Sequence, residues 1–101
     1  MITCFVTYTI DPQKTIEFEI FAKNWIRLVN ENGGTHHGYF LPAEGADDVA
    51  YALFSFESLT AYEFYRSLFS SNAEFKKAND YKYETGCVVR HDRTFMRPVF
   101  T

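Results

Sequence analysis

Two adjacent histidines, His36 and His37, are the residues of this chain best suited to acid–base chemistry. They lie in a glycine-framed segment, residues 33–40, that has the pattern of a short strand. Imidazole changes its protonation near neutral pH, so either side chain could serve as a general base. Neighbouring strand residues point to opposite faces of a sheet, so we expect one ring in a pocket under helices and the other toward a partner chain. The alternative is that both are hydrogen-bonded structural residues, and we expect no metal site from the pair.

Five further side chains could bind and orient a small molecule. Arg66 follows Tyr62 by four residues, so on a helix its guanidinium could stack on that ring or bind a carboxylate. The alternative is an exposed arginine paired with Glu57 or Glu63 on the surface. The candidate substrate-binding residues are Tyr39, Glu44, Tyr62, Tyr65 and Arg66.

Composition indicates one small domain, residues 1–101, with an unusually high aromatic content of 19%. Aromatic residues supply much buried area each, which favours an interface or a ligand pocket in addition to the core. A formal charge of −3 argues against nucleic-acid binding. No segment has the pattern of a signal peptide or a membrane span. Two isolated cysteines, Cys4 and Cys87, predict free buried thiols, and we expect a cytoplasmic protein with no cofactor.

The elements that must position these residues can be located from hydrophobic periodicity. Alternating patterns predict strands over residues 2–10, 35–41, 49–56 and 87–95. Apolar spacing of three and four predicts a helix that Asp11 caps and Pro12 opens, ending at residues 32–34. Ser58 is expected to cap a second helix, with one or two further helical turns over residues 73–83.

This order of elements, βαββαβ, predicts an α+β ferredoxin-like fold. In it a four-stranded antiparallel sheet carries its helices on one face. The third strand is apolar on both sides, so it should be central, and the helix-free face needs a cover. We therefore predict a homodimer in which two sheets pack face to face as a dimeric α/β barrel. The apolar tail, residues 95–100, is expected to pack as well. The first and last strands should be adjacent and antiparallel, which places Cys4 and Cys87 too far apart for a disulfide.

At this point the chain resembles the NIPSNAP family over nearly its whole length. The features that carry the resemblance are an aromatic-rich first strand, Pro12 opening the first helix, Trp25 late in it, and a set of short ordered motifs. These motifs are Gly38-Tyr39-Phe40, Glu44-Gly45, Phe56-Glu57-Ser58-Leu59 with Tyr62 and Arg66, and Phe95-Met96-Arg97-Pro98. The resemblance implies the dimeric barrel and a pocket between helix and sheet. Related barrels include small monooxygenases, lactone isomerases and haem-degrading enzymes, an analogy at the level of fold.

Two functions follow as hypotheses. The first is a homodimeric domain that binds an apolar or aromatic small molecule between sheet and helices. As an enzyme it would be a cofactor-independent monooxygenase or isomerase, with His36 or His37 transferring the proton and Arg66 and Tyr39 orienting the substrate. The second is a non-catalytic interaction or stress-response module that uses the barrel as a dimer scaffold. A cavity of about 300 Å³ or more, lined by histidine, arginine and tyrosine, favours the first hypothesis; a filled interior favours the second.

Overall fold

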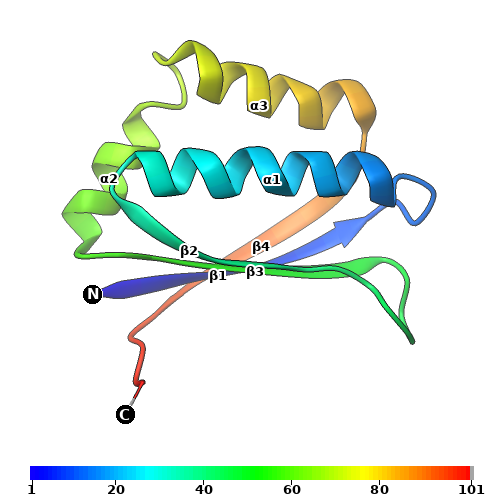
Figure 1. The fold of residues 1–101 in the computed structure, drawn as a ribbon, viewed down its shortest axis with the longest axis horizontal. Helices are drawn as coiled ribbons and strands as arrows, with labels where there is room; N and C mark the ends of the chain where they lie inside the picture. Colours follow the sequence, from blue (N-terminus) through cyan, green and yellow to red (C-terminus); the bar gives the residue numbers. More distant parts are fainter. Residues whose placement is uncertain (101) are drawn as a thin grey trace.

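The computed structural model describes residues 1–100 and has the predicted strand–helix–strand–strand–helix–strand order, with the second helical region divided in two (Figure 1). All helices lie on one side of a single sheet, and the C-terminal tail leaves on the other side. The elements are β1 (Ile2–Ile10), α1 (Thr15–Glu31), β2 (Gly34–Phe40), β3 (Val49–Phe56), α2 (Leu59–Ser67), α3 (Ala73–Thr85) and β4 (Val88–Met96).

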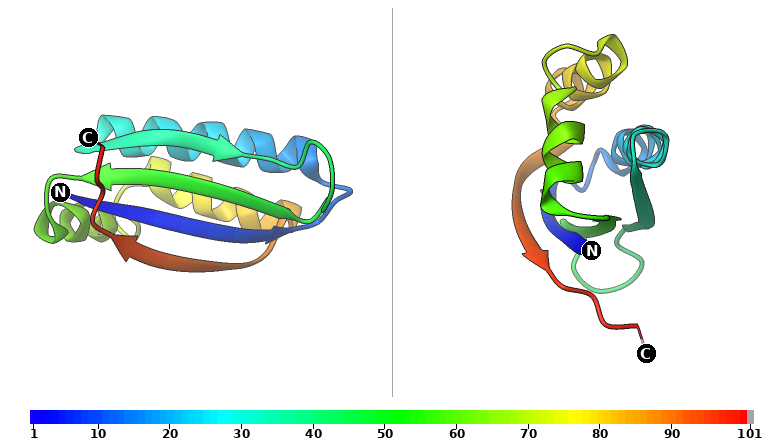
Figure 2. Two further views of the ribbon diagram at one scale, coloured as in Figure 1. Left: turned by 90° about the horizontal axis from the view of Figure 1, so that it is seen from below. Right: turned by 90° about the vertical axis from the view of Figure 1, so that its left-hand side faces the viewer.

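The sheet is antiparallel with the strand order β2-β3-β1-β4 (Figure 2). This is the ferredoxin-like order, so the predicted fold class is confirmed. β3 lies between β2 and β1 as its apolar pattern predicted, and β4 pairs antiparallel with β1 at an edge. Cys4 pairs with Phe95 near the far end of β4, whereas Cys87 precedes that strand, and both thiols are free and buried. The expectation of no disulfide is confirmed.

The core lies between the sheet and the helices α1, α2 and α3, with α1 as its longest cover. One face of β1 is buried from Cys4 to Ile10 at every second residue, because the side chains of a strand alternate between its faces. The apolar stripe of α1 covers that face at helical spacing. Its buried members are the ones that the periodicity predicts: Phe18, Phe21, Ala22, Trp25, Leu28 and Val29.

The beginning of α1 differs from the prediction. The helix begins at Thr15, and the residue before it is Lys14 rather than Asp11. The Asp11 carboxylate accepts a hydrogen bond from the backbone N–H of Gln13 at 2.9 Å, and the Asp11 carbonyl accepts from Lys14 at 2.9 Å. Asp11 and Pro12 therefore build a tight turn that precedes the helix. Aspartate followed by proline is equally suited to a turn, which is why the sequence pattern misplaced the start.

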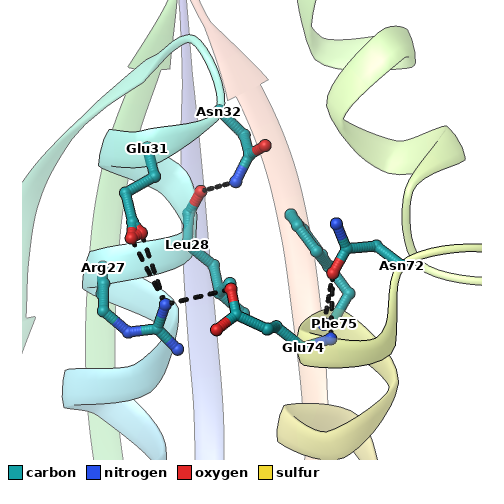
Figure 3. Close-up of polar contacts among 7 residues, drawn as sticks. All are labelled: Arg27, Leu28, Glu31, Asn32, Asn72, Glu74 and Phe75. Carbon is teal, nitrogen blue, oxygen red and sulfur yellow. Dashed lines mark hydrogen bonds and ion pairs between the residues drawn. The ribbon is translucent and has the colours of Figure 1, made fainter.

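Both α2 and α3 have side-chain N-caps, and one ionic contact links α3 to α1. Ser58 caps α2 as predicted, its hydroxyl accepting from the N–H of Ala61 at 3.1 Å. Asn72 caps α3 by accepting from the first N–H groups of that helix (Figure 3). Arg27 of α1 bridges to Glu74 of α3 at 3.3 Å (Figure 3). Because both side chains are exposed, the pair contributes little to stability.

The helix-free face of the sheet carries apolar side chains that nothing in this chain covers. Phe5 of β1 stacks on Tyr51 of β3 with ring centroids 5.5 Å apart, and Tyr51 and Phe40 remain 40% and 56% exposed. The tail beyond β4 extends past this face, with Val99 and Phe100 largely exposed (Figure 2). Among residues 1–100, no helix is long and apolar enough to cross a membrane.

Candidate functional site

A cavity of about 70 Å³ lies between the sheet and the helices. Its walls are mainly aromatic, and its polar side chains come from β2, α1, α3 and β4. The volume is well below the roughly 300 Å³ of a drug-sized ligand site. The lining contains the histidine, arginine and tyrosine side chains that the ligand-binding hypothesis required. The lining residues are Val6, Tyr8, Phe21, Trp25, Val29, His36, Tyr39, Phe54, Tyr62, Tyr65, Phe69, Asn79, Lys82, His91 and Arg93.

A β-bulge at His37 decides which side chains of β2 enter the cavity. The register pairs His36 with Phe54 and Tyr39 with Ala52, so three residue steps on β2 face two on β3. On a regular strand, residues three apart point to opposite faces. Because the bulge adds one residue, His36 and Tyr39 point to the same face of the sheet. Their rings stack on the helix side with centroids 4.9 Å apart. Gly38 completes the bulge with a φ of 110°, a conformation that other residues rarely adopt.

The hydrogen bonds of His36 indicate which of its ring nitrogens carries the proton. Its Nδ1 accepts from the backbone N–H of Gly38 at 2.9 Å, so in the neutral ring the hydrogen is on Nε2. Burial, with the nearby His37 as a smaller cause, lowers the pKa of His36 to about 4, so the ring is neutral at pH 7. A neutral ring in this tautomer donates from Nε2. This geometry suits stabilising a developing negative charge better than abstracting a proton.

Two buried N–H donors of the cavity walls have no partner among residues 1–100. They are Nε2 of His36 and Nε1 of Trp25, the only tryptophan of the chain. An unsatisfied buried donor costs on the order of 1–3 kcal/mol, so most are paired with protein, water or ligand. Trp25 packs against aromatic side chains of α3 and of the turn between α2 and α3, with the ring centroids of Phe69 and Phe75 at 5.0 and 5.8 Å. Both nitrogens are sealed from solvent in this structure, so a water or a ligand oxygen could accept from them only after a local movement of the cavity walls.

Two phenols form the floor of the cavity beside these donors. The hydroxyls of Tyr8 and Tyr39 lie 3.3 Å apart, close enough to share a weak hydrogen bond. Burial raises the pKa of Tyr8 to about 12 and holds the pKa of Tyr39 well above its ordinary value. Both groups are protonated at neutral pH, so they can donate hydrogen bonds but cannot act as bases. Burial likewise raises the pKa of the nearby Cys4 thiol to about 11.

The open side of the cavity is cationic, which the sequence reading did not identify. His91 and Arg93 of β4 are exposed and line the cavity together with Lys82 of α3. In the sequence, the charges of residues 90–93 are equally typical of an edge strand protected from aggregation, and β4 is an edge strand. The pairing register between β1 and β4 would have revealed these residues. His91 pairs with Tyr8 and Arg93 with Val6, and both partners are core residues of β1.

The other predicted site residues are distributed as follows. His36, Tyr39, Tyr62 and Tyr65 line the cavity together. His37 lies on the helix-free face, where its Nε2 is 2.7 Å from the Ser55 hydroxyl, so the two histidines do point to opposite faces.

Glu44 and Arg66 are exposed and do not line the cavity. The Arg66 guanidinium lies 4.3 Å from the ring centre of Phe69 rather than over Tyr62, and among residues 1–100 it forms no ion pair with Glu57 or Glu63. In that part of the chain, no three histidine, cysteine or acidic side chains lie close enough to hold a metal ion.

With the fold and the cavity described, comparison with known proteins identifies the family. The model of the NIPSNAP family matches residues 3–101, so the chain belongs to the NIPSNAP family. No curated protein matches the sequence significantly.

Solved structures with the same fold include both family members and proposed enzymes. A NIPSNAP family protein of unknown function from Agrobacterium tumefaciens superposes with a TM-score of 0.80 at 15% identity, covering 97% of this chain and 87% of that one. A NIPSNAP-like domain protein from Burkholderia xenovorans gives 0.77 at 20% identity, with 97% and 84% covered. A proposed antibiotic biosynthesis monooxygenase from Nitrosomonas europaea gives 0.75 at 11% identity, with 99% and 100% covered. At these identities the likeness concerns the fold alone.

Proposed function

We propose that this NIPSNAP domain binds a small aromatic molecule between sheet and helices and acts on it as a cofactor-independent monooxygenase. The observation that carries the proposal is the pair of unpartnered N–H donors, His36 Nε2 and Trp25 Nε1, in an aromatic cavity. Donors placed in this way stabilise negative charge on a substrate oxygen, and so favour the enolate or phenolate form of an aromatic ketone or phenol. The monooxygenase assignment of the Nitrosomonas neighbour supports the same chemistry by analogy.

The reaction needs no oxidant beyond dioxygen. An enolate is electron-rich enough to react with O₂ directly. When a ring CH₂ becomes C=O, the carbon loses two hydrogens and four electrons. Dioxygen accepts those four electrons, placing one oxygen atom in the product and releasing the other as water. Isomerisation of the same enolate is the companion reaction within this proposal, with the substrate's proton released to solvent and returned at another carbon.

The test replaces each donor while keeping the shape of the site. His36→Asn retains an acceptor for the Gly38 N–H but removes the Nε2 donor, and Trp25→Phe removes the indole donor. With enolisable aryl ketones as probes, O₂ uptake should fall about 10²-fold in kcat for His36→Asn, the usual effect of losing one such donor. His37→Asn, on the other face of the sheet, is the matched control and should keep wild-type kcat. Equal kcat in wild type and His36→Asn would contradict the role of His36.

The second candidate function is a non-catalytic binding or interaction module. The small cavity of about 70 Å³ favours it, because a substrate larger than one ring needs more room. Saturable binding of aromatic probes with neither O₂ uptake nor isomerisation would favour the module over the enzyme.

We further propose that two copies pair through the helix-free faces of their sheets. The uncovered apolar side chains of β1, β2 and β3 support this pairing, since exposed apolar patches mark interaction surfaces. The exposed tail, residues 97–100, would then pack on the partner. The two free buried thiols support the expectation of a reducing compartment such as the cytoplasm.

A further inference from the structure

The cavity has a marked charge asymmetry that a purely apolar ligand would leave unused. Three basic side chains, Lys82, His91 and Arg93, line its open side, and no aspartate or glutamate is among its lining residues. The whole chain has the opposite bias, with 13 acidic against 10 basic residues. A cluster of basic side chains without acids, two of them permanent cations, is the arrangement expected around an anion.

The two permanent cations of this cluster are not neutralised by the protein. Among residues 1–100 no ion pair involves Lys82 or Arg93. The acidic neighbour in sequence, Asp92, belongs to the opposite face of β4, where it pairs with Thr7 of β1 and bonds Arg90 at 3.0 Å. Arg93 instead donates to Nε2 of His91 at 3.3 Å. Burial and the positive charges of Arg93, Lys82 and Arg66 lower the pKa of His91, although Asp92 acts in the opposite direction.

His36 and Arg93 enter the cavity from opposite edges of the sheet. His36 is on β2 and Arg93 on β4, the two edge strands, with β3 and β1 between them. Three strand spacings of about 4.8 Å separate their backbones by roughly 14 Å across the sheet, and the register sets them two residues apart along the strands. Side chains reach inward from both edges, and the aromatic walls formed by Tyr8, Phe54 and Tyr65 lie between them. A single aromatic ring with one polar group at each end fits this spacing and the small volume of the cavity.

We infer that the cavity recognises a single-ring aromatic carboxylate. Its carboxylate pairs with Arg93 and Lys82, and a hydroxyl or carbonyl oxygen at the far end of the ring accepts from Trp25 and His36. This inference rests on the proposed function and specifies its substrate class. Arginine and carboxylate match in geometry and charge, so the pair supplies specificity as well as affinity.

The first experiment compares an acid with its neutral isostere. The probes are 4-hydroxybenzoate and 4-hydroxybenzamide, titrated at pH 7 into the wild-type protein. Calorimetry gives the affinity, and the NMR signal of the Trp25 indole N–H reports contact at the inner end. A charge-assisted bond exceeds a neutral one by about 1.4 kcal/mol, so the acid should bind about tenfold more tightly. Added salt should lower the affinity for the acid and leave the affinity for the amide unchanged.

Variants locate the charge that causes this preference. Arg93→Gln combined with Lys82→Gln should bring the acid and the amide to equal affinity. Arg90→Gln, which makes the same change on the same strand but on the opposite face, should keep the tenfold preference. Circular dichroism checks that each variant folds. If a variant does not fold, the wild-type titrations with acid, amide and added salt still test the inference.

The outcomes separate this inference from the function on which it rests. Equal binding of acid and amide by the wild type would overturn the carboxylate inference and leave aromatic binding intact. If Arg90→Gln lost the preference for the acid as fully as the double variant, the inference would also be overturned. The net positive charge of β4, and not a contact in the cavity, would then cause the preference. Absence of binding by either probe, with no change of the Trp25 signal, would overturn both proposals.

Discussion

His36 is held in the folded protein as a neutral donor because its surroundings remove water and supply no negative charge. The ring lies between Tyr39 and Phe54, with centroids at 4.9 and 5.5 Å, and its backbone N–H donates to the Asn30 side chain. Burial penalises the charged imidazolium, and the neighbouring His37 adds to the effect. The result is a donor of fixed orientation, which is what stabilisation of an oxyanion requires.

This state of His36 predicts a loss of stability in mild acid. Its pKa is about 4 in the folded chain against an ordinary 6.5, so between these values the unfolded chain binds a proton that the folded chain does not. The contribution is complete above pH 6.5 and falls as the pH drops toward 4. It amounts to about 2 kcal/mol once the partial exposure of the ring is allowed for.

Urea unfolding of wild type and His36→Asn at pH 7 and pH 4.5 measures this effect. The wild type should lose about 2 kcal/mol more than the variant on acidification, since acidic groups contribute equally to both. His37→Asn, which removes a histidine from the other face, should lose nearly as much as the wild type, because burial is the larger cause of the His36 shift. A wild type and a His36→Asn variant with parallel pH profiles would show that His36 is not held neutral by burial.

At the scale of the element, the bulge in β2 is the device that brings His36 and Tyr39 into one site. Replacing Gly38 by alanine places a Cβ on a backbone with a φ of 110°, although no side chain obstructs it. The cost of such a conformation is about 1–3 kcal/mol. The strand can relieve it by losing the bulge, and one of the two rings must then leave the cavity.

Gly38→Ala should therefore lower the stability and also abolish binding of aromatic probes at the Trp25 signal. Gly45→Ala is the matched control, because Gly45 has a similar φ of 99° in an exposed loop with open space around it. It should lose comparable stability and keep wild-type binding. Retained binding in Gly38→Ala would show that the bulge does not position the site.

The elements themselves were largely predictable from the sequence, and the bulge shows why the site was less so. Periodicity located β1, β3 and the buried stripe of α1, because each depends on many side chains that alternate or repeat. The faces of His36 and Tyr39 depend on one extra residue, and the only sign of it was a glycine inside a strand pattern. Arg93 and His91 required the register between β1 and β4, which no local pattern contains.

At the scale of the whole molecule, the chain is flat, and only one face of its sheet is covered by helices. Its dimensions are 36 × 36 × 18 Å, and all the helices cover the same face (Figure 1). A second copy laid on the open face would bury Phe40, Tyr51 and the stacked Phe5 between two sheets, which pack about 10 Å apart. For a chain of 101 residues the added burial is a large part of what can stabilise it.

The pairing predicts that Tyr51→Glu yields a monomer and that stability depends on protein concentration. At micromolar concentration the wild type should have twice the chain's mass of 11.8 kDa by light scattering, while Tyr51→Glu should have the single mass, since it places a charge in the middle of the apolar face. Ile16→Glu, an equally drastic change at a 73% exposed site on α1, should remain a dimer. Because binding of a partner stabilises only the folded chain, the unfolding midpoint of the wild type should rise with concentration, whereas that of Tyr51→Glu should not. A wild type that scatters as a monomer with a concentration-independent midpoint would mean that the open face is covered by something other than a second copy.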